Sequence, residues 1–224
     1  MKLTTLWFGL ALTVAHPAAA QDEAPNYPLP PSRDNQVALF NGRDFSGWTF
    51  CMKGGADPAK TWRVTNGVIH CTGKPVGYLR TTQSYSNYFL TVEWRFVKIA
   101  PKADNTGILV HLQPPDQVWP RCVQIQGKHG RQGDIFLMEG AEAKEHQGMD
   151  KNTPVPMRFP SVENPVGQWN LAETICVRNQ VESFINGKFV NEISDCTLNQ
   201  GCIGIQSEGG DIEIRTISFS PLKY

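Results

Sequence analysis

Apolar and polar residues alternate with a period of two through most of the chain, and this pattern restricts the fold to β-structure. Residues 89–97 read FLTVEWRFV, so that one side of an extended strand carries Leu90, Val92, Trp94 and Phe96 and the other carries Thr91, Glu93 and Arg95. The same alternation recurs in 107–113, 122–126 and 201–208. No window of a dozen residues has the 3.6-residue period of an amphipathic helix.

Turn signals between these segments favour an antiparallel arrangement. Asn66-Gly67 and Asn186-Gly187 each separate two strand-like runs, which is the signature of a two-residue hairpin. About ten or more short strands, with turns every 8–12 residues or so, predict an all-β antiparallel β-sandwich or jelly roll. Three tryptophans are expected in its core: Trp48, Trp62 and Trp94. The segment 140–165 lacks alternation and is interpreted as a long loop of functional interest.

The first 20 residues have the pattern of an export signal. Lys2 precedes a short apolar run, and Ala18-Ala19-Ala20 forms a cleavage signature before Gln21. The run is too short to span a membrane as a permanent anchor, so a periplasmic or secreted protein is expected. Residues 21–36 are interpreted as a Pro-rich tether, and 37–224 as one sandwich domain.

Composition narrows the function classes. The 21 basic residues balance the 21 acidic ones, which leaves no electrostatic footprint for nucleic acid. Nucleotide-binding, zinc-protease and serine-hydrolase motifs are missing from the sequence. No cofactor is predicted, and although a divalent metal bound by His and Glu stays open, no ligand spacing supports it. The oligomeric state is left open.

The six cysteines are expected to be structural. An even number in an exported chain favours disulfides, and the pairs Cys51–Cys71 and Cys196–Cys202 are preferred because each flanks a turn-rich stretch.

Polar side chains on the alternating strands form the candidate site. Residues two apart share a face, which pairs Glu93 with Arg95, His111 with Gln113, Gln124 with Gln126, and Gln206 with Glu208. If the strands are neighbours, amides, a carboxylate, an imidazole and a guanidinium line one concave surface suited to sugar hydroxyls. The alternative is that each side chain simply faces solvent on a one-sided sheet. Trp119 and Trp169 border loops, where an indole can act as a platform for a sugar ring.

Ordered blocks along the chain resemble the 3-keto-disaccharide hydrolase domain family. They are LFNGRDFSGW (39–48), TWRVTNGVIHC with YLRTTQSYSNYFLTVEWRF (61–96), NTGILVH (105–111), WPRCVQIQ (119–126), GQWN (167–170), FINGKFV (184–190) and GCIGIQSEGGDIEIRTISFSPL (201–222). The resemblance covers about residues 37–222. It implies a concanavalin A-like sandwich acting on glycosides whose C3 hydroxyl has been oxidised to a ketone.

The resemblance also implies site residues. Glu93 and Arg95 match the family's "vEfR" strand, Asn105 and Gly107 match its "NSGi" turn, and Gln206, Glu208 and Arg215 match its C-terminal block. Glu93 or His111 is expected as the catalytic base. The expected substrate-binding residues are Arg95, Asn105, Gln124, Gln126, Trp169, Gln206 and Glu208.

Two departures from the family pattern bear on function. Gln124 stands where many members have a Glu, and His111 stands where many have an Arg. The polar strand residues and the family resemblance together favour an exported enzyme that cleaves 3-keto-glycosides. The alternatives are a non-catalytic carbohydrate-binding domain and a structural sandwich with no ligand. For the enzyme, Glu93, Arg95, His111, Gln124 and Gln126 are expected to converge in one pocket near the loop 140–165.

The cleavage signature predicts that the mature protein begins at Gln21. Mass spectrometry of the protein recovered after export should give the mass of 21–224. Recovery of a chain that still carries Met1–Ala20 would contradict the prediction.

Overall fold

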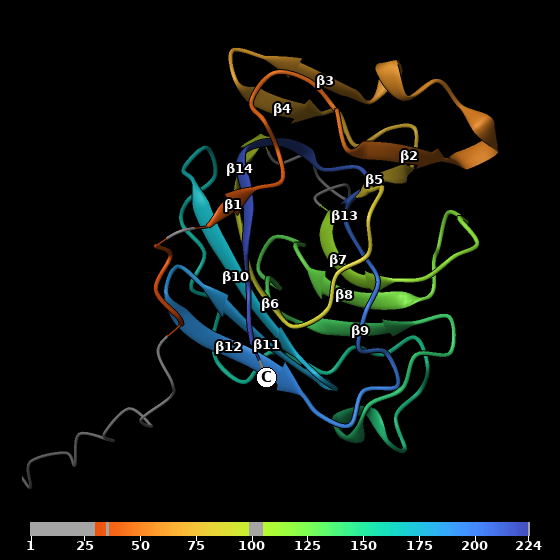
Figure 1. The fold of residues 1–224 in the computed structure, drawn as a ribbon, viewed down its shortest axis with the longest axis vertical. Helices are drawn as coiled ribbons and strands as arrows, with labels where there is room; N and C mark the ends of the chain where they lie inside the picture. Colours follow the sequence, from red (N-terminus) through yellow and green to blue (C-terminus); the bar gives the residue numbers. More distant parts are fainter. Residues whose placement is uncertain (1–29, 35, 99–104, 224) are drawn as a thin grey trace, which may run out of the picture.

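Two antiparallel β-sheets packed face to face make up the fold (Figure 1). The computed structural model describes residues 30–34, 36–98 and 105–223. The expected signal peptide and residues 21–29 of the expected tether lie outside the described residues. The prediction of an all-β antiparallel sandwich from the alternating pattern is confirmed.

The larger sheet has eight strands. Their spatial order is β12 (Lys188–Ile193), β11 (Gln180–Ile185), β10 (Asn170–Val177), β6 (Tyr88–Lys98), β14 (Asp211–Pro221), β4 (Val68–Cys71) and β3 (Trp62–Thr65), with β1 (Val37–Ala38) beside β14.

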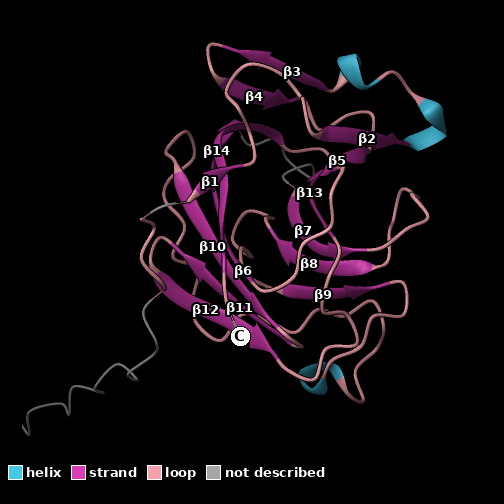
Figure 2. Ribbon diagram, in the orientation of Figure 1, coloured by secondary structure: helices cyan, strands magenta, loops and turns pink. Residues whose placement is uncertain are grey.

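The smaller sheet has six strands. Their order is β2 (Trp48–Met52), β5 (Gly77–Thr81), β13 (Cys202–Ser207), β7 (Gly107–Leu112), β8 (Cys122–Gln126) and β9 (Ile135–Met138). The helical segments among the described residues are short 3-10 turns at the periphery, namely η1 (Lys53–Gly55), η2 (Pro58–Lys60) and η3 (Lys144–His146) (Figure 2).

The main core fills the space between the sheets with the apolar half of each alternating strand. On β6 these residues are Leu90, Val92, Trp94 and Phe96, and all four are buried. The facing sheet contributes Ile108, Ile125 and Ile205 among others. The expected core tryptophans Trp48, Trp62 and Trp94 are all buried in this cluster, as predicted.

Both predicted hairpins are present. Asn66-Gly67 joins β3 to β4 and Asn186-Gly187 joins β11 to β12, with all four residues at positive φ (53° and 78°, 53° and 75°). Two successive positive φ values define the turn type that matches the twist of paired strands, and Asn followed by Gly adopts it at the lowest cost. Asn186 also links neighbouring segments, since its amide donates to Val162 O at 2.9 Å and accepts from Leu171 N at 2.9 Å.

The end of the expected tether lies against the outer face of the larger sheet. Gln36 donates from Nε2 to the Thr91 hydroxyl at 2.8 Å, and Arg33 Nε contacts the fully buried Glu173 carboxylate at 2.8 Å. Residues 30–34 and 36 therefore do more than act as a spacer before the domain. They cover part of a sheet face that the alternation alone would expose.

The loop 140–165 closes one side of the sandwich. Val155 exchanges backbone hydrogen bonds with Ile135 on β9 at 2.8 and 2.9 Å, and Arg158 N donates to Val190 O on β12 at 2.9 Å. Asn191 adds side-chain bonds to Gly133 O and Val155 O, both at 3.0 Å. Because β9 and β12 are the edge strands of the two sheets, this segment satisfies edge groups that would otherwise be unpaired.

The expected disulfides are absent, and all six cysteines are free thiols. Cys71 and Cys196 belong to the main core between the sheets. Cys51 and Cys202 pack instead against a second cluster on the outer face of the smaller sheet, which consists of Tyr78, Leu109, Leu112 and Cys122. The prediction was wrong because closeness in a turn-rich sequence does not place two thiols on the same side of a sheet.

Thiol reactivity should follow this burial. In the folded protein Cys51 and Cys202, which are partly exposed, should react first with a thiol reagent. Burial raises the pKa of Cys71 and of Cys176 to about 12, which keeps both thiols protonated and slow to react. After unfolding without reductant, titration should detect all six thiols. Fewer than six would restore the disulfide hypothesis.

Candidate active site

A cleft of about 660 Å³ lies on the outer face of the smaller sheet. Its floor is formed by outward-facing residues of β8, β9 and β13, and its sides by Trp119 of the β7–β8 loop and by residues of the 139–152 loop. We call it the outer cleft. Its polar lining at one end consists of Asn105, Gln124, Gln126, Gln206 and Glu208.

Strand register brings these side chains together. Gln124 and Gln126 point outward from β8 while Val123 and Ile125 point into the main core. On β13 Gln206 points outward, and the neighbouring Ile205 pairs with Ile108 of β7. Since β7 also pairs with β8, the amides of β8 and β13 lie on either side of β7.

Gly107 on β7 leaves the room that these amides occupy. A Cβ at this position would lie 2.9 Å from both Cγ and Nε2 of Gln124. Any larger residue would therefore displace the Gln124 side chain, which explains the physical need for glycine at this point of the sheet.

The amides are almost completely buried and partly bonded to each other. Gln124 donates from Nε2 to Gln126 Oε1 at 3.2 Å, and Gly127 N donates to the same oxygen at 3.1 Å. Two buried acceptors in the cleft, Gln206 Oε1 and Asn105 Oδ1, have no protein partner. A buried polar atom without a partner is costly, so these two oxygens favour a ligand that brings hydroxyl donors.

Glu208 is the carboxylate at this polar end. Asn105 Nδ2 donates to Glu208 Oε2 at 2.6 Å, which fixes the direction of the carboxylate. Burial raises the pKa of Glu208 above its ordinary value of 4.5, and the positive charge of Lys128 lowers it in part. A positioned carboxylate with a raised pKa is suited to accept a proton from a bound molecule.

The expected base Glu93 does not reach this cleft. It lies on β6 in the larger sheet and points away from the main core, where the Arg215 guanidinium pairs with it, with Arg215 Nε 2.6 Å from Glu93 Oε2. Arg95, on the same face, pairs with Glu213 at 2.6 Å. The predicted convergence of Glu93 and Arg95 with Gln124 and Gln126 is therefore wrong, because the two pairs occupy opposite outer faces of the sandwich.

Trp169 belongs to the same outer face of the larger sheet as Glu93. The guanidinium carbons of Arg95 and Arg215 both lie 4.4 Å from the centre of its indole ring. The indole is thus stacked within an ion-pair cluster, and its expected role as a substrate-binding residue of the common pocket is not supported by its position.

His111 points into the sandwich, contrary to the expectation that it shares a pocket with Gln124. Its φ of 53° and the shift in register between β7 and β13 at this point identify a β-bulge, which reverses the side on which the next side chain falls. The imidazole Nδ1 lies 3.1 Å from Leu198 O, and the ring packs edge-on against Tyr88. Burial lowers the pKa of His111 to about 4, so the ring is neutral.

Sequence reasoning missed the apolar part of the cleft. Phe136 and Met138 of β9 face the cleft, although all four residues of β9 (IFLM) are apolar and show no alternation. Trp119, which the sequence predicts as a platform for a sugar ring, also lines the cleft.

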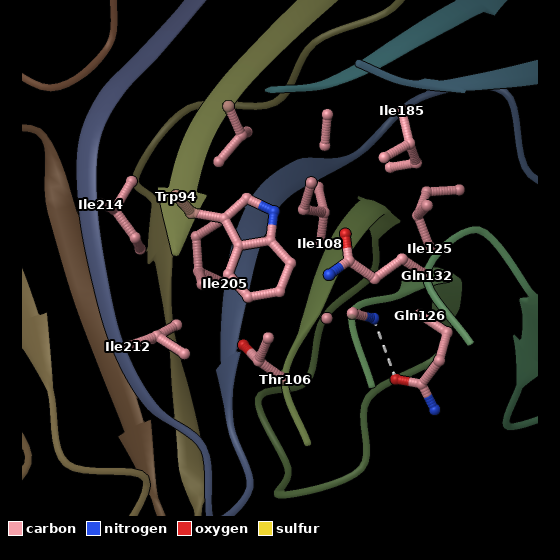
Figure 3. Close-up of a pocket in the computed structure, with 14 residues that line it drawn as sticks. Trp94, Thr106, Ile108, Ile125, Gln126, Gln132, Ile185, Ile205, Ile212 and Ile214 are labelled. Atoms are coloured by element: carbon pink, nitrogen blue, oxygen red, sulfur yellow. Dashed lines mark hydrogen bonds between the residues drawn. The ribbon is translucent and has the colours of Figure 1, made fainter. Parts of the chain in front are cut away.

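A second cavity lies inside the sandwich, where Trp94 is surrounded by isoleucines of both sheets (Figure 3). Its volume of about 10 Å³ is close to the space that one water molecule requires. It is a packing gap, and the outer cleft remains the candidate site.

Within 30–34, 36–98 and 105–223, no three His, Cys, Asp or Glu side chains gather as metal ligands would. Over the same ranges, no helix has the length and apolar character needed to cross a membrane.

Solved structures with similar folds place the chain among lectin-like sandwiches. A protein from Parabacteroides distasonis ATCC 8503, described as a "putative glycosyl hydrolase", is 22% identical with a TM-score of 0.62, over 84% of this chain and 94% of that one. The carbohydrate-binding module CBM66 from Bacillus subtilis is 9% identical with a TM-score of 0.56, over 78% and 95%. The exoplasmic/lumenal domain of VIP36, in its Ca²⁺/Man3GlcNAc-bound form, is 10% identical with a TM-score of 0.59, over 86% and 90%. At these identities the likeness defines the fold.

The family is defined by the sequence. Residues 35–220 match the 3-keto-alpha-glucoside-1,2-lyase-like domain, so the chain belongs to this family of carbohydrate-active domains. The family resemblance inferred from the sequence blocks is confirmed. No curated protein matches the chain.

The position of Glu93 predicts a structural role. Glu93→Gln should lower the free energy of unfolding by about 1 kcal/mol or less, because the ion pair with Arg215 is partly exposed (25% and 44%) and screened by solvent. Urea unfolding of Glu93→Gln, Arg215→Gln and the double variant would measure the coupling between the two residues. A loss of several kcal/mol would contradict this account.

Proposed function

We propose that the protein is an exported enzyme that cleaves 3-keto-glycosides in the outer cleft, with Glu208 as the base. The observation that carries this proposal is the placement of Glu208, with its raised pKa and its hydrogen bond from Asn105, beside three amides that a sugar can contact. Export rests on the signal pattern of residues 1–20.

The reaction begins with removal of a proton. A ketone at C3 acidifies the hydrogen on C2, and the Glu208 carboxylate takes this proton. The electrons of the C2–H bond then form the C1=C2 double bond while the C1–O bond breaks. The aglycone oxygen leaves with the electron pair of the C1–O bond and takes up the proton that Glu208 removed. Addition of water, hydroxyl to C1 and proton to C2, completes a net hydrolysis.

The amides supply the polar contacts that this chemistry needs. Because its Oε1 already accepts two hydrogen bonds, Gln126 meets a ligand with its Nε2 donor. Such a donor stabilises the negative charge that develops on the C3 oxygen during proton removal. Gln206 Oε1 and Asn105 Oδ1 accept hydrogen bonds from sugar hydroxyls.

The second candidate function is carbohydrate binding without catalysis. It is favoured by Gln124, which places an amide where many members of the family have a Glu. The two functions differ in one observable, which is the release of an aglycone from a 3-keto-glycoside.

Substitution of the proposed base tests the function. Glu208→Gln should lower turnover of 3-keto-trehalose or a 3-keto-glucoside by about 10²–10⁴ while leaving sugar binding largely intact. Glu93→Gln, which changes the same side chain on the opposite outer face, is the matched control and should turn over at the wild-type rate. If the wild-type protein binds these compounds and releases no sugar, the binding function replaces the enzymatic one.

The raised pKa of Glu208 predicts a pH dependence. The base acts only when ionised, so kcat/KM should fall as the pH drops through a pKa that burial places above 4.5. A pH–rate profile should contain this acidic limb in the wild type and in Glu93→Gln. A limb that persists unchanged in the residual activity of Glu208→Gln would assign it to another group.

A further inference from the structure

The floor of the outer cleft changes from polar to apolar along the strand direction, and the 139–152 loop at its side carries the polar residues Glu139, Glu142, His146, Lys151 and Asn152. At one end Gln126 of β8 pairs with Gly107, close to Asn105 before β7 and Glu208 after β13. At the other end Cys122 of β8 pairs with Met138 of β9. The two ends of β8 are four residues apart, which corresponds to about 13 Å of extended chain.

The apolar end has a floor and a side of large side chains. Phe136 pairs with Gln124 in the middle of the cleft, and Met138 follows two residues later on the same face of β9. Trp119, three residues before β8, and Met149 of the 139–152 loop also line the cleft. Trp119 is 41% exposed, which is unusual for a residue of this size.

Trp119 is carried by an anchored loop. Asp116 accepts two hydrogen bonds from the Arg80 guanidinium, both at 2.7 Å, and one from the Tyr78 hydroxyl at 3.0 Å. Arg80 and Tyr78 project from β5 on the outer face of the smaller sheet. The β7–β8 loop is therefore fixed to the sheet three residues before Trp119, which limits where the indole can lie before any ligand arrives.

We propose that Trp119, Phe136 and Met138 form a subsite for an aromatic aglycone, the group released from C1. The proposal rests on the proposed function, which puts the 3-keto ring at the polar end with C2 next to Glu208. The substituent on C1 then extends toward the apolar end.

An aromatic ring suits this end better than a second sugar does. Indole and phenyl groups stack on a planar ring, and the thioethers of Met138 and Met149 make favourable contacts with aromatic edges. A second sugar could reach polar side chains of the 139–152 loop, but the side of its ring toward the floor would lie against the Phe136 ring and the Met138 thioether, which offer no strong hydrogen-bonding groups. An aryl oxide is also a better leaving group than an alkyl oxide, so the elimination needs less help from an acid.

The test compares two substrates that differ only in the aglycone, the 3-keto forms of phenyl glucoside and methyl glucoside. Wild-type protein should have the higher kcat/KM for the phenyl compound. Trp119→Ala should lower kcat/KM for the phenyl compound by about tenfold through KM and leave the methyl compound unchanged. Trp119→Phe, which keeps an aromatic face, should restore most of the preference.

A second variant and a control complete the comparison. Met149→Ala, on the other loop, should shift the phenyl-to-methyl ratio in the same direction as Trp119→Ala. Val166→Ala changes an exposed apolar residue outside the cleft lining and should shift nothing. Equal losses for both substrates in Trp119→Ala, or no phenyl preference in the wild type, would overturn the proposal.

Equilibrium binding separates this proposal from the proposed function. Calorimetric titration with unoxidised phenyl glucoside requires no turnover and should show tighter binding than methyl glucoside, a difference that Trp119→Ala abolishes. If that difference is found but no 3-keto-glycoside is cleaved, the subsite stands and the proposed function fails. If both 3-keto-glucosides are cleaved with no effect of Trp119→Ala, the subsite fails and the proposed function stands.

Discussion

The burial of alternate residues between the two sheets determines on which surface of the protein the remaining side chains of each strand lie. Each strand gives one face to the common core, so its other face is on the outside of whichever sheet it joins. The inner faces of the two sheets are about 10 Å apart, whereas their outer faces lie on opposite sides of the molecule. A polar residue such as Glu93 or Gln124 is therefore assigned to one surface or the other by the sheet to which its strand belongs.

The two outer faces use their polar residues in different ways. On the larger sheet Glu93, Arg95, Glu213 and Arg215 pair with one another around Trp169, so opposite charges are matched within the protein. On the smaller sheet Gln206 and Asn105 keep buried acceptor atoms without protein partners. Charges that are paired within the protein stabilise a surface and leave few groups free to bind a ligand. Buried acceptors without protein partners favour the binding of a ligand.

The outer cleft also depends on chain segments that carry no strand pattern. The loop 140–165 both closes the side of the sandwich at Val155 and contributes to the wall of the cleft. The β7–β8 loop is tied down by Asp116 and presents Trp119 beside Phe136. Sheets thus provide a rigid polar floor, and anchored loops provide the surfaces that select what lies above it.

From the sequence we could predict the strands, both hairpins, the buried tryptophans, the family and the outward position of Gln124, Gln126 and Gln206. These features follow from local rules, namely period-two alternation, Asn-Gly turns and ordered sequence blocks. The assignment of Glu93 and Arg95 to the opposite face required the packed fold, because alternation defines two sides of a strand without saying which sheet it joins. The inward direction of His111 depends on a bulge between β7 and β13. Cys51 and Cys71 are free because a sheet separates them. Both features are relations between distant segments that no local pattern encodes.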